Sequence, residues 1–242
     1  TFQAGHRFNL IEMTKFLTIN LISLLCYYSG NKYKERRHIM LIAFEGGEGS
    51  GKGTQIKLLK KFLEDKGYSV LDIIEPGGTP VGKEIRSILL EKEGLGLLGI
   101  TEAFLFSASR SQQVRSVTRP ALKEGKIVLS DRSFYSTYAY QGYGREQSLS
   151  FIQQLTALAV EDTVPDIVIL LDIPPEVGLL RKKDQKEFNR LDAESLEFHN
   201  RVRSGYLTLA RGDPYTWKII NAQLSVSEIH LQVVSFILNY LK

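Results

Sequence analysis

Five of the nine residues from Gly46 to Thr54 are glycine, and Lys52 lies among them. Glycines let a backbone curl so that successive N–H groups point inward at an anion, and a following helix adds the positive end of its dipole. A lysine in this place can reach the outer phosphates of a nucleoside triphosphate. A glycine-rich turn without a ligand is the alternative, but the spacing Gly46-x-x-x-x-Gly51-Lys52, between an apolar run and a helical pattern, disfavours it. We expect a phosphate-binding loop whose nucleotide-binding residues are Gly46, Gly47, Glu48, Gly49, Ser50, Gly51, Lys52, Gly53 and Thr54.

The position after Lys52 departs from the usual form of such loops, which have a serine or threonine there for Mg²⁺. This chain has Gly53, and Thr54 follows one residue later. The metal would then meet a hydroxyl directly, or be held mainly by phosphates and water. We predict Mg²⁺ as the cofactor, with Thr54 and Asp131 as its contacts, directly or through water.

An acidic and a basic residue, Asp131 and Arg132, follow the apolar run 126–129 and Ser130. Ligands of α/β proteins bind at the carboxyl ends of parallel strands, so both side chains are expected at the binding edge. Asp131 can hold Mg²⁺ or its water, and Arg132 can clamp phosphates. A surface ion pair is the alternative, but a phosphate-binding loop on a neighbouring strand favours the functional interpretation.

Two further segments suit a nucleotide, although their residues alone leave the roles open. The turn Glu75–Pro80 is rigid and poor in side chains, so a planar ligand could approach its backbone. A plain turn with Pro80 opening a helix explains it equally well. Phe106 and Arg110 share a helix face, where the ring could pack on a base and the guanidinium could bind a phosphate. Without further context, a core Phe106 and a solvated Arg110 are the better explanation.

Residues 181–191 are rich in basic side chains, with acidic ones interspersed. A mobile basic lid that closes over transferring phosphates would exclude water and neutralise the developing charge. A solvated helix end is the usual explanation of such a run, but the phosphate-binding loop favours a lid. The basic residues are Arg181, Lys182, Lys183, Lys186 and Arg190.

The elements that must position these residues alternate between short apolar runs and helical patterns. The runs are continuous in Val, Ile and Leu, which indicates strands buried on both faces of a parallel sheet. We expect an α/β fold of three layers, with a five-stranded parallel sheet covered by helices on both faces. The expected strands are 41–44, 69–73, 126–129, 166–171 and 217–220. The expected helices are 52–66, 81–91, 101–124, 148–160, 175–183, 192–210 and 227–241.

Composition and charge exclude several classes of protein. The chain has 242 residues, of which 43% are apolar and 24% charged, as in ordinary globular proteins. The net charge of +4 comes from residues 1–39, which hold six of the 31 basic and two of the 27 acidic groups. Nucleic-acid binding is therefore not expected. The single cysteine, Cys26, allows no disulfide within the chain and suits a cytoplasmic location.

Residues 1–39 differ in character from the rest of the chain. The apolar stretch 16–28 is too short to span a bilayer as a helix, and basic residues follow it at 32–37. A weak membrane anchor is one interpretation. We prefer the other, in which 1–39 is an atypical leader, disordered or upstream of a natural start at Met40, and 40–242 is one domain with a lid around 181–191.

The motifs occur together and in order, and residues 40–242 resemble bacterial thymidylate kinases over essentially their whole length. The “EPGGTP” turn and the Asp-Arg pair followed by “AYQG” are far more particular to that family than the phosphate-binding loop is. The stretches that carry the resemblance are “LIAFEGGEGSGKGTQ” (41–55), “EPGGTPVGKEIRSILL” (75–90), “TEAFLFSASRSQQV” (101–114), “RPALKEGKIVLSDRS” (119–133), “STYAYQG” (136–142), “LLDIPPEVGLLR” (170–181) and “ESLEFHNRVRSGYLTLA” (194–210).

The resemblance implies transfer of phosphate from ATP to dTMP with Mg²⁺, by a homodimer. By matching position, Glu48 lies near the dTMP sugar, Phe106 lies against thymine, and Arg110 and Arg132 hold the acceptor phosphate. The resemblance implies catalytic roles for Lys52, Asp131, Arg132, Arg181 and Arg190. It implies dTMP contacts for Glu48, Pro76, Phe106, Arg110, Arg132, Ser136, Tyr140 and Gln141. The chain departs from the family pattern at Ile74, Ser109, Ser133 and Asn221, and its lid is rich in lysine.

Three rival functions are open at this point. Gly53-Thr54 resembles adenylate kinases, so another nucleoside monophosphate kinase is one rival, and preferential use of AMP would favour it. The departures suggest a second, a weakened nucleotide-binding or regulatory module, which would bind ATP and dTMP without product. A kinase tethered to a membrane by residues 16–37 is the third.

Overall fold

The computed structural model describes residues 40–91, 95–184 and 189–241 of the chain. The predicted leader, 1–39, lies outside the described residues, as do residues 185–188 of the predicted lid. None of the helices in the described ranges has both the length and the apolar character that a membrane crossing requires.

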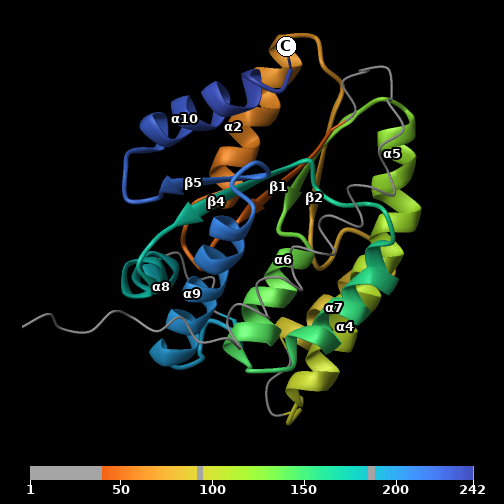
Figure 1. Ribbon diagram of the computed structural model, residues 1–242, viewed down its shortest axis with the longest axis vertical. Coiled ribbons are helices and arrows are strands. Elements are labelled where there is room, and N and C mark those ends of the chain that lie inside the picture. The colour runs from red at the N-terminus through yellow and green to blue at the C-terminus, as the bar shows by residue number, and fades with distance from the viewer. Residues whose placement is uncertain (1–39, 92–94, 185–188, 242) are drawn as a thin grey trace, which may run out of the picture. The chain divides into compact units, whose positions relative to one another are not determined.

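Five parallel strands form one sheet in the order β2-β3-β1-β4-β5 (Figure 1), which confirms the predicted fold class. Each strand begins and ends within two residues of its predicted bounds. The strands are β1 Met40–Glu45, β2 Val70–Ile74, β3 Ile127–Asp131, β4 Ile167–Asp172 and β5 Trp217–Asn221. The prediction of burial on both faces is right for β1, β3 and β4 and wrong for β2 and β5, because these two are the edge strands.

Helices connect the strands and cover both faces of the sheet. The α-helices are α2 Lys52–Asp65, α3 Pro80–Arg86, α4 Gly99–Gln113, α5 Arg119–Lys123, α6 Phe134–Thr137, α7 Leu149–Val160, α8 Pro175–Asp184, α9 Leu196–Gly212 and α10 Val226–Leu238. The π-helical segments are η1 Ser87–Glu91, η2 Val114–Thr118 and η3 Tyr138–Gly144.

The core lies on both faces of the central strands. On one face, alternate residues of β1 such as Ile42 and Phe44 pack with side chains of α2 and α10. On the other face, Leu41 packs with Val128 of β3 and with Ala121 of α5. Figure 1 shows α4, α6, α7 and α9 on the α5 side. Because β1 is the central strand and β3 its neighbour, the carboxyl ends of both meet at one edge, where Phe44 pairs with Asp131.

Four predicted helices differ from their predicted bounds by three residues or more, α10 among them because it ends at Leu238, and one helical segment was not predicted. Helix α9 begins four residues late because Ser195 caps it, its Oγ accepting a hydrogen bond from the Phe198 N–H. The long helix expected over 101–124 is interrupted by η2, just before Pro120, which has no N–H to continue the ladder. Helix 81–91 likewise ends as η1. The unpredicted segment, 134–144, is rich in aromatic residues and glycine, so its apolar residues do not show a clear helical spacing.

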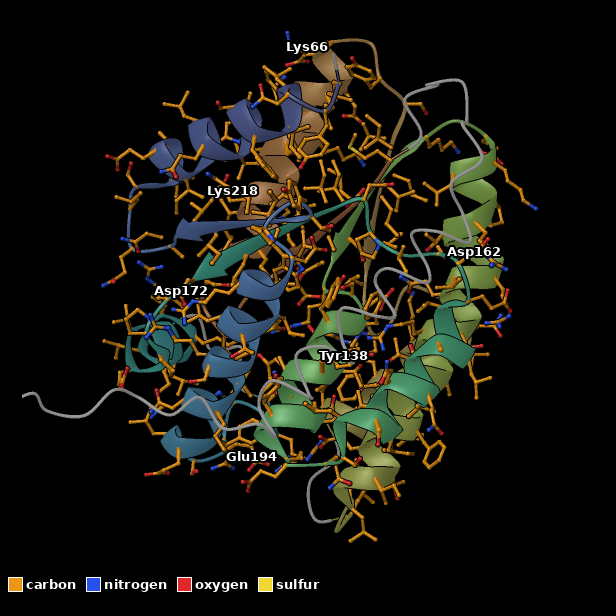
Figure 2. The ribbon with its side chains drawn as sticks, viewed as in Figure 1. Lys66, Tyr138, Asp162, Asp172, Glu194 and Lys218 are labelled. Carbon is orange, nitrogen blue, oxygen red and sulfur yellow. The ribbon has the colours of Figure 1, made fainter. Side chains whose placement is uncertain are left out.

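A bidentate ion pair fixes α9 against the sheet. Arg203 of α9 donates from Nε and Nη2 to the two carboxylate oxygens of Asp172, at 2.8 and 2.9 Å. Asp172 is the last residue of β4 and is labelled in Figure 2. Helix α9 therefore lies over the same edge of the sheet as the glycine-rich loop.

Candidate active site

A cavity of about 450 Å³ opens at the carboxyl edge of the sheet. The glycine-rich loop forms one wall, the Asp131–Arg132 pair another, and the turn after β2 a third. Of the predicted site residues it is lined by Glu48, Gly49, Ser50, Gly51, Lys52, Gly53, Thr54, Pro76, Phe106, Asp131, Arg132, Ser136, Tyr140 and Gln141. The segments predicted to bind the donor and the acceptor, far apart in sequence, therefore line one cavity.

The glycine-rich loop requires glycine where it passes closest to the rest of the chain. Gly49 has a φ of 64°, and a Cβ there would lie 2.1 Å from the carbonyl oxygen of Gly178 in α8. Gly46 has a φ of 142°, and a Cβ there would lie 2.5 Å from the carbonyl oxygen of Leu171. The loop is thereby held in a curled conformation against β4 and α8.

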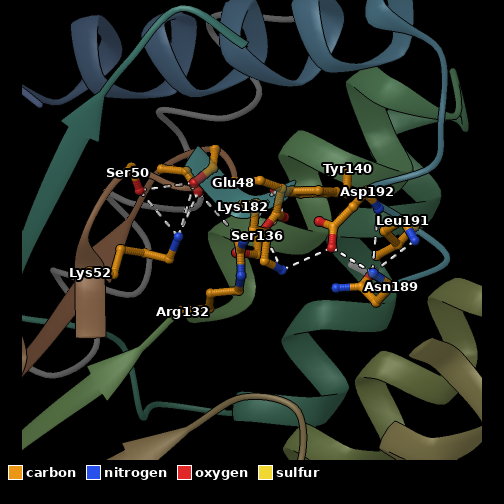
Figure 3. A network of polar contacts seen from close by, with 12 residues as sticks. Glu48, Ser50, Lys52, Arg132, Ser136, Tyr140, Lys182, Asn189, Leu191 and Asp192 are labelled. Carbon is orange, nitrogen blue, oxygen red and sulfur yellow. Dashed lines mark hydrogen bonds and ion pairs between the residues drawn. The ribbon is translucent and has the colours of Figure 1, made fainter. Parts of the chain in front are cut away.

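Lys52 points back into the loop. Its Nζ donates to the carbonyl oxygens of Gly46 and Gly47 at 3.2 and 3.1 Å and to Ser50 Oγ at 3.3 Å (Figure 3). Burial and the nearby Arg132 lower the pKa of this amine to about 8, although acidic neighbours oppose them. The amine is therefore still largely protonated at neutral pH, and it lies where an anion in the loop would meet it.

Arg132 is the most densely bonded cation of the cavity. Its Nη2 donates to Glu48 Oε1 at 2.8 Å and to Tyr140 Oη at 3.1 Å, and its Nη1 donates to the Gly46 carbonyl at 3.1 Å. Burial raises the pKa of Glu48, but Arg132, Lys52 and Lys182 outweigh it and hold that pKa well below its usual range. Glu48 is therefore ionised, and Figure 3 shows it in one polar network with Arg132, Tyr140 and Lys182.

Asp131 and the loop form a place for a divalent cation that needs few protein ligands. A Cβ at Gly53 would lie 3.9 Å from Asp131 Oδ2, so the carboxylate faces the start of α2. Thr54 and Asp131 both line the cavity. Within the described ranges, no three or more His, Cys, Asp or Glu residues group as metal ligands. The donor set fits Mg²⁺, which binds through one or two carboxylates while phosphates and water complete its shell.

The acceptor side combines aromatic, amide and backbone groups. Phe106 is half-buried and lines the cavity, so the core packing expected for it is incomplete. Tyr140 donates to Glu48 Oε1 at 2.7 Å, and Gln141 Nε2 donates to Glu102 Oε1 at 2.8 Å. Ser136 is buried and reaches Arg132 Nη1 at 3.3 Å. These groups can accept a planar base beside the phosphate-binding cations.

Three predicted site arginines do not line the cavity. Arg110, far from being solvated, is 3% exposed and donates to Glu75 Oε2 at 2.6 Å, Thr137 Oγ1 at 2.8 Å and the Ser133 carbonyl at 3.0 Å. It lies directly behind Glu75 and Thr137, which are part of the lining.

The two predicted lid arginines, Arg181 and Arg190, bond to other parts of the chain. Arg181 donates to the carbonyl oxygens of Ala222 at 3.0 Å and Gly49 at 3.5 Å. Arg190 donates to the Leu89 carbonyl at 2.8 Å and pairs with Glu102. The catalytic roles expected for both stay predictions.

Three cations that line the cavity were not among the predicted site residues: Lys57, Arg86 and Lys182, the last named only as part of the basic lid. Arg86 ends α3, and its Nη1 donates to the Pro76 carbonyl at 2.8 Å. Its place in the quoted “EPGGTPVGKEIRSILL” stretch is the signal that could have identified it. Lys182 has its Nζ 2.9 Å from Asp192 Oδ2 and 3.5 Å from Glu48 Oε2. The sequence of the basic run does not distinguish Lys182 from its basic neighbours. The orientation of α8 decides which of these side chains faces the cavity.

The four residues that depart from the family pattern lie in different parts of the structure. Ile74 lines the cavity at the end of β2, and it is 42% exposed. Ser109 is buried, against Gly82. Ser133 caps α6, accepting from the Tyr135 N–H at 3.3 Å. Asn221 accepts from the Gln223 N–H at 2.9 Å, in the turn after β5.

Comparison with known proteins agrees with this geometry. The family model described as “Thymidylate kinase” matches residues 44–233, a range that includes the loop and every residue of the cavity lining. The thymidylate kinase of Maridesulfovibrio salexigens is 44% identical over 210 residues, covering 84% of this chain and 97% of that protein. The thymidylate kinase of Chlorobium luteolum is 46% identical over 204 residues, covering 81% and 95%. The crystal structure of thymidylate kinase from Ehrlichia chaffeensis superimposes with a TM-score of 0.67 at 33% identity, covering 82% of this chain and 98% of that one. The chain belongs to the thymidylate kinase family.

Proposed function

We propose that the chain transfers the γ-phosphate of ATP to dTMP, giving ADP and dTDP, a step in dTTP synthesis. One observation carries the proposal: a single cavity joins the phosphate-binding loop and Lys52 to a second set of cations beside aromatic and amide groups. Membership of the thymidylate kinase family supports dTMP as the acceptor. The relatives found by comparison favour neither another nucleoside monophosphate kinase nor a regulatory module.

The donor nucleotide binds at the loop in this proposal. The N–H groups of the loop and the start of α2 surround the ATP phosphates, and Lys52 neutralises their charge. Mg²⁺, when bound, supplies further neutralisation and is held through Asp131 and Thr54, directly or through water. Because Gly53 offers no hydroxyl, Asp131 is the main protein contact on this side.

The acceptor binds on the opposite wall. Arg132 and Arg86 hold the phosphate of dTMP, with Phe106 against the thymine ring. Tyr140, Gln141, Ser136 and Pro76 complete the pocket, and Glu48 lies near the sugar. Arg110 keeps Glu75 and Thr137 in place behind the lining.

The reaction needs no covalent nucleophile. A phosphate oxygen of the acceptor is already an anion, so no strong general base is required. Catalysis comes from in-line positioning of two nucleotides and neutralisation of the charge on the moving phosphoryl group. Arg132 and Lys52 supply much of that neutralisation from fixed positions.

A cation from the lid completes the neutralisation, and we assign that role to Lys182. Among the described basic residues of the lid it is the one in the cavity lining, whereas Arg181 and Arg190 bond to carbonyl groups and Glu102. Arg181 then fixes α8 against the loop, and Arg190 fixes the segment before α9.

The active unit is proposed to be a cytoplasmic homodimer. Apolar side chains on α4 and α7 support association: Ile100 and Phe104 are exposed on α4, and Phe104 packs edge-on against Phe151 of α7. Leu158 of α7 is 75% exposed. Light scattering on the purified chain tests the dimer, and a monomer at micromolar concentration would contradict it.

The proposed function is tested by measuring ADP release with ATP and Mg²⁺ while dTMP, dUMP, AMP, CMP and GMP are offered in parallel. A strong preference for dTMP is expected. A preference for AMP would favour another nucleoside monophosphate kinase. ATP and dTMP binding without any product would instead favour a regulatory module.

A further inference from the structure

The Glu45 carboxylate is completely buried directly before the glycine-rich loop. It ends β1 and does not line the cavity. Among the described residues no cation forms an ion pair with it. Four hydrogen-bond donors surround it instead, and a buried carboxylate needs such partners because burial otherwise disfavours its charge.

One oxygen of Glu45 holds the backbone immediately after Arg132. Oε1 accepts from the Ser133 N–H at 2.8 Å and from Ser133 Oγ at 2.7 Å. Arg132 itself has a φ of 72°, a left-handed conformation that is unfavourable for a residue with a Cβ. The Arg132 N–H donates to the Phe44 carbonyl at 2.9 Å. The end of β1 therefore fixes the backbone on both sides of the Arg132 α-carbon.

The other oxygen of Glu45 orients two hydroxyl groups that also bond to the Arg132 guanidinium. Oε2 accepts from Ser136 Oγ at 2.7 Å and from Tyr206 Oη at 2.8 Å. The same two oxygens accept from Arg132 Nη1 at 3.3 and 3.2 Å. The two hydroxyl oxygens also lie 2.7 Å from each other, so their two protons serve three contacts. Because Arg132 only donates, each hydroxyl turns a lone pair to Arg132 and its proton to Glu45 or to the other hydroxyl. Burial and Glu45 raise the pKa of Tyr206 well above its ordinary value, so this proton is retained.

We propose that Glu45 is a positioning residue for the acceptor phosphate, setting the direction of the Arg132 guanidinium through Ser133, Ser136 and Tyr206. The proposal rests on the proposed function, in which Arg132 binds that phosphate. Glu45 touches neither nucleotide. Its effect is to keep the guanidinium of Arg132 in one place while Glu48, on the cavity side, exchanges partners as the substrate enters.

The first test is Glu45→Gln, which preserves the shape. The amide nitrogen donates where Oε2 accepted, so both hydroxyl protons turn away from it. One proton can bond to the other hydroxyl, and the second then turns toward Arg132. A guanidinium displaced by about 1 Å is expected to lower kcat/KM for dTMP about 10²-fold. The dissociation constant of ATP stays unchanged. Tyr206→Phe, which removes one relay hydroxyl and keeps the ring, gives a smaller loss of the same kind and is available if Glu45→Gln does not fold.

A double-mutant cycle separates positioning from a structural role. If Glu45 acts through Arg132, then Glu45→Gln added to Arg132→Met causes almost no further loss in kcat/KM for dTMP. Additive losses would overturn the proposal. So would a Glu45→Gln protein with a lower unfolding temperature but an unchanged KM for dTMP, because a merely structural residue changes the amount of active protein only.

The wild-type chain separates this proposal from the proposed function. If wild type neither binds nor phosphorylates dTMP, the proposed function fails, and with it the acceptor role of Arg132. If wild type is active and Glu45→Gln and Tyr206→Phe match it in KM and kcat for dTMP, only the positioning role fails.

Discussion

Arg132 and Glu48 form an ion pair in which Nη2 of the arginine lies 2.8 Å from Oε1 of the glutamate, with 16% and 11% of their side chains exposed. The glutamate belongs to the glycine-rich loop and the arginine follows the neighbouring strand. The pair therefore joins the wall of the cavity that is proposed to bind the donor to the wall that is proposed to bind the acceptor. If Arg132 binds the acceptor phosphate as proposed, that phosphate competes with Glu48 for the guanidinium.

Lys52 predicts an alkaline limit on ATP use. Burial lowers its pKa to about 8, so the amine loses its charge as the pH rises through that value. We expect kcat/KM for ATP, which reports the free enzyme, to fall about tenfold per pH unit above about pH 8. Bound phosphates raise the pKa, so kcat falls only at higher pH. The activity that Lys52→Arg retains should not show this fall above pH 8. A wild-type kcat/KM for ATP that stays constant up to pH 9.5 would contradict the role given to Lys52.

Replacing Gly53 by serine is expected to raise the affinity for Mg²⁺. A serine there adds a hydroxyl beside Asp131 without a clash, since its Cβ would lie 3.9 Å from Oδ2. Gly53→Ser is expected to lower the half-saturating Mg²⁺ concentration about fivefold, the equivalent of about 1 kcal/mol. Gly49→Ala is the matched contrast, because its Cβ would lie 2.1 Å from the Gly178 carbonyl, and it should lose activity. An unchanged Mg²⁺ requirement in Gly53→Ser would place the metal elsewhere.

Replacing Lys182 is expected to lower turnover rather than nucleotide binding. If it neutralises the moving phosphoryl group, Lys182→Met should lower kcat about 10²-fold and leave the KM values for both nucleotides nearly unchanged. Lys182→Arg keeps the charge and should restore much of the rate. Lys61→Met, on the exposed side of α2, is the control for the loss of a lysine. Equal kcat values for Lys182→Met and the control would return the role to the predicted lid arginines.

The buried pair of Arg110 and Glu75 predicts a stability loss that depends on pH. Arg110→Met leaves the Glu75 carboxylate buried without a cation, which should cost about 3–5 kcal/mol at pH 8 in urea unfolding. Burial already raises the pKa of Glu75 above 4.5, and the substitution raises it further. A raised folded-state pKa means that the penalty is absent below the unfolded pKa and grows as the pH rises, so the loss should be smaller at pH 5.

Two companion variants check the stability prediction. Arg110→Met combined with Glu75→Gln should recover part of the loss, because no charge is then buried. Lys61→Met, which removes an exposed ion pair with Asp65, should cost about 0–1 kcal/mol. A loss for Arg110→Met that is the same at pH 5 and pH 8 would contradict the role given to Glu75.

Local patterns predict the strands and the loop well, because both depend on short-range signals. The apolar runs fix β1, β3 and β4, and the glycine spacing fixes the loop between β1 and α2. The segment 134–144 escaped prediction because its aromatic residues and glycines obscure the helical period. Its cap, Ser133, is fixed by Glu45, which lies 88 residues earlier in the chain.

Side-chain direction is the part of the site that sequence cannot supply. The basic run 181–190 suggests a lid, but the turn of α8 decides that Lys182 faces the cavity and Arg181 the loop carbonyl. The site role of Arg110 was predicted from the family resemblance, since its spacing with Phe106 alone favoured a solvated side chain. Its pairing with Glu75, 35 residues away, depends on how α4 packs behind β2.

The most direct measurement of the central claim is the separation of products after incubation of the wild-type chain and Arg132→Met with ATP, Mg²⁺ and dTMP. Wild type is predicted to form dTDP and ADP in equal amounts. Arg132→Met should bind ATP as wild type does and form dTDP at least about 10²-fold more slowly. A folded wild-type protein that binds ATP and releases no dTDP would contradict the account, as would an Arg132→Met variant as fast as wild type.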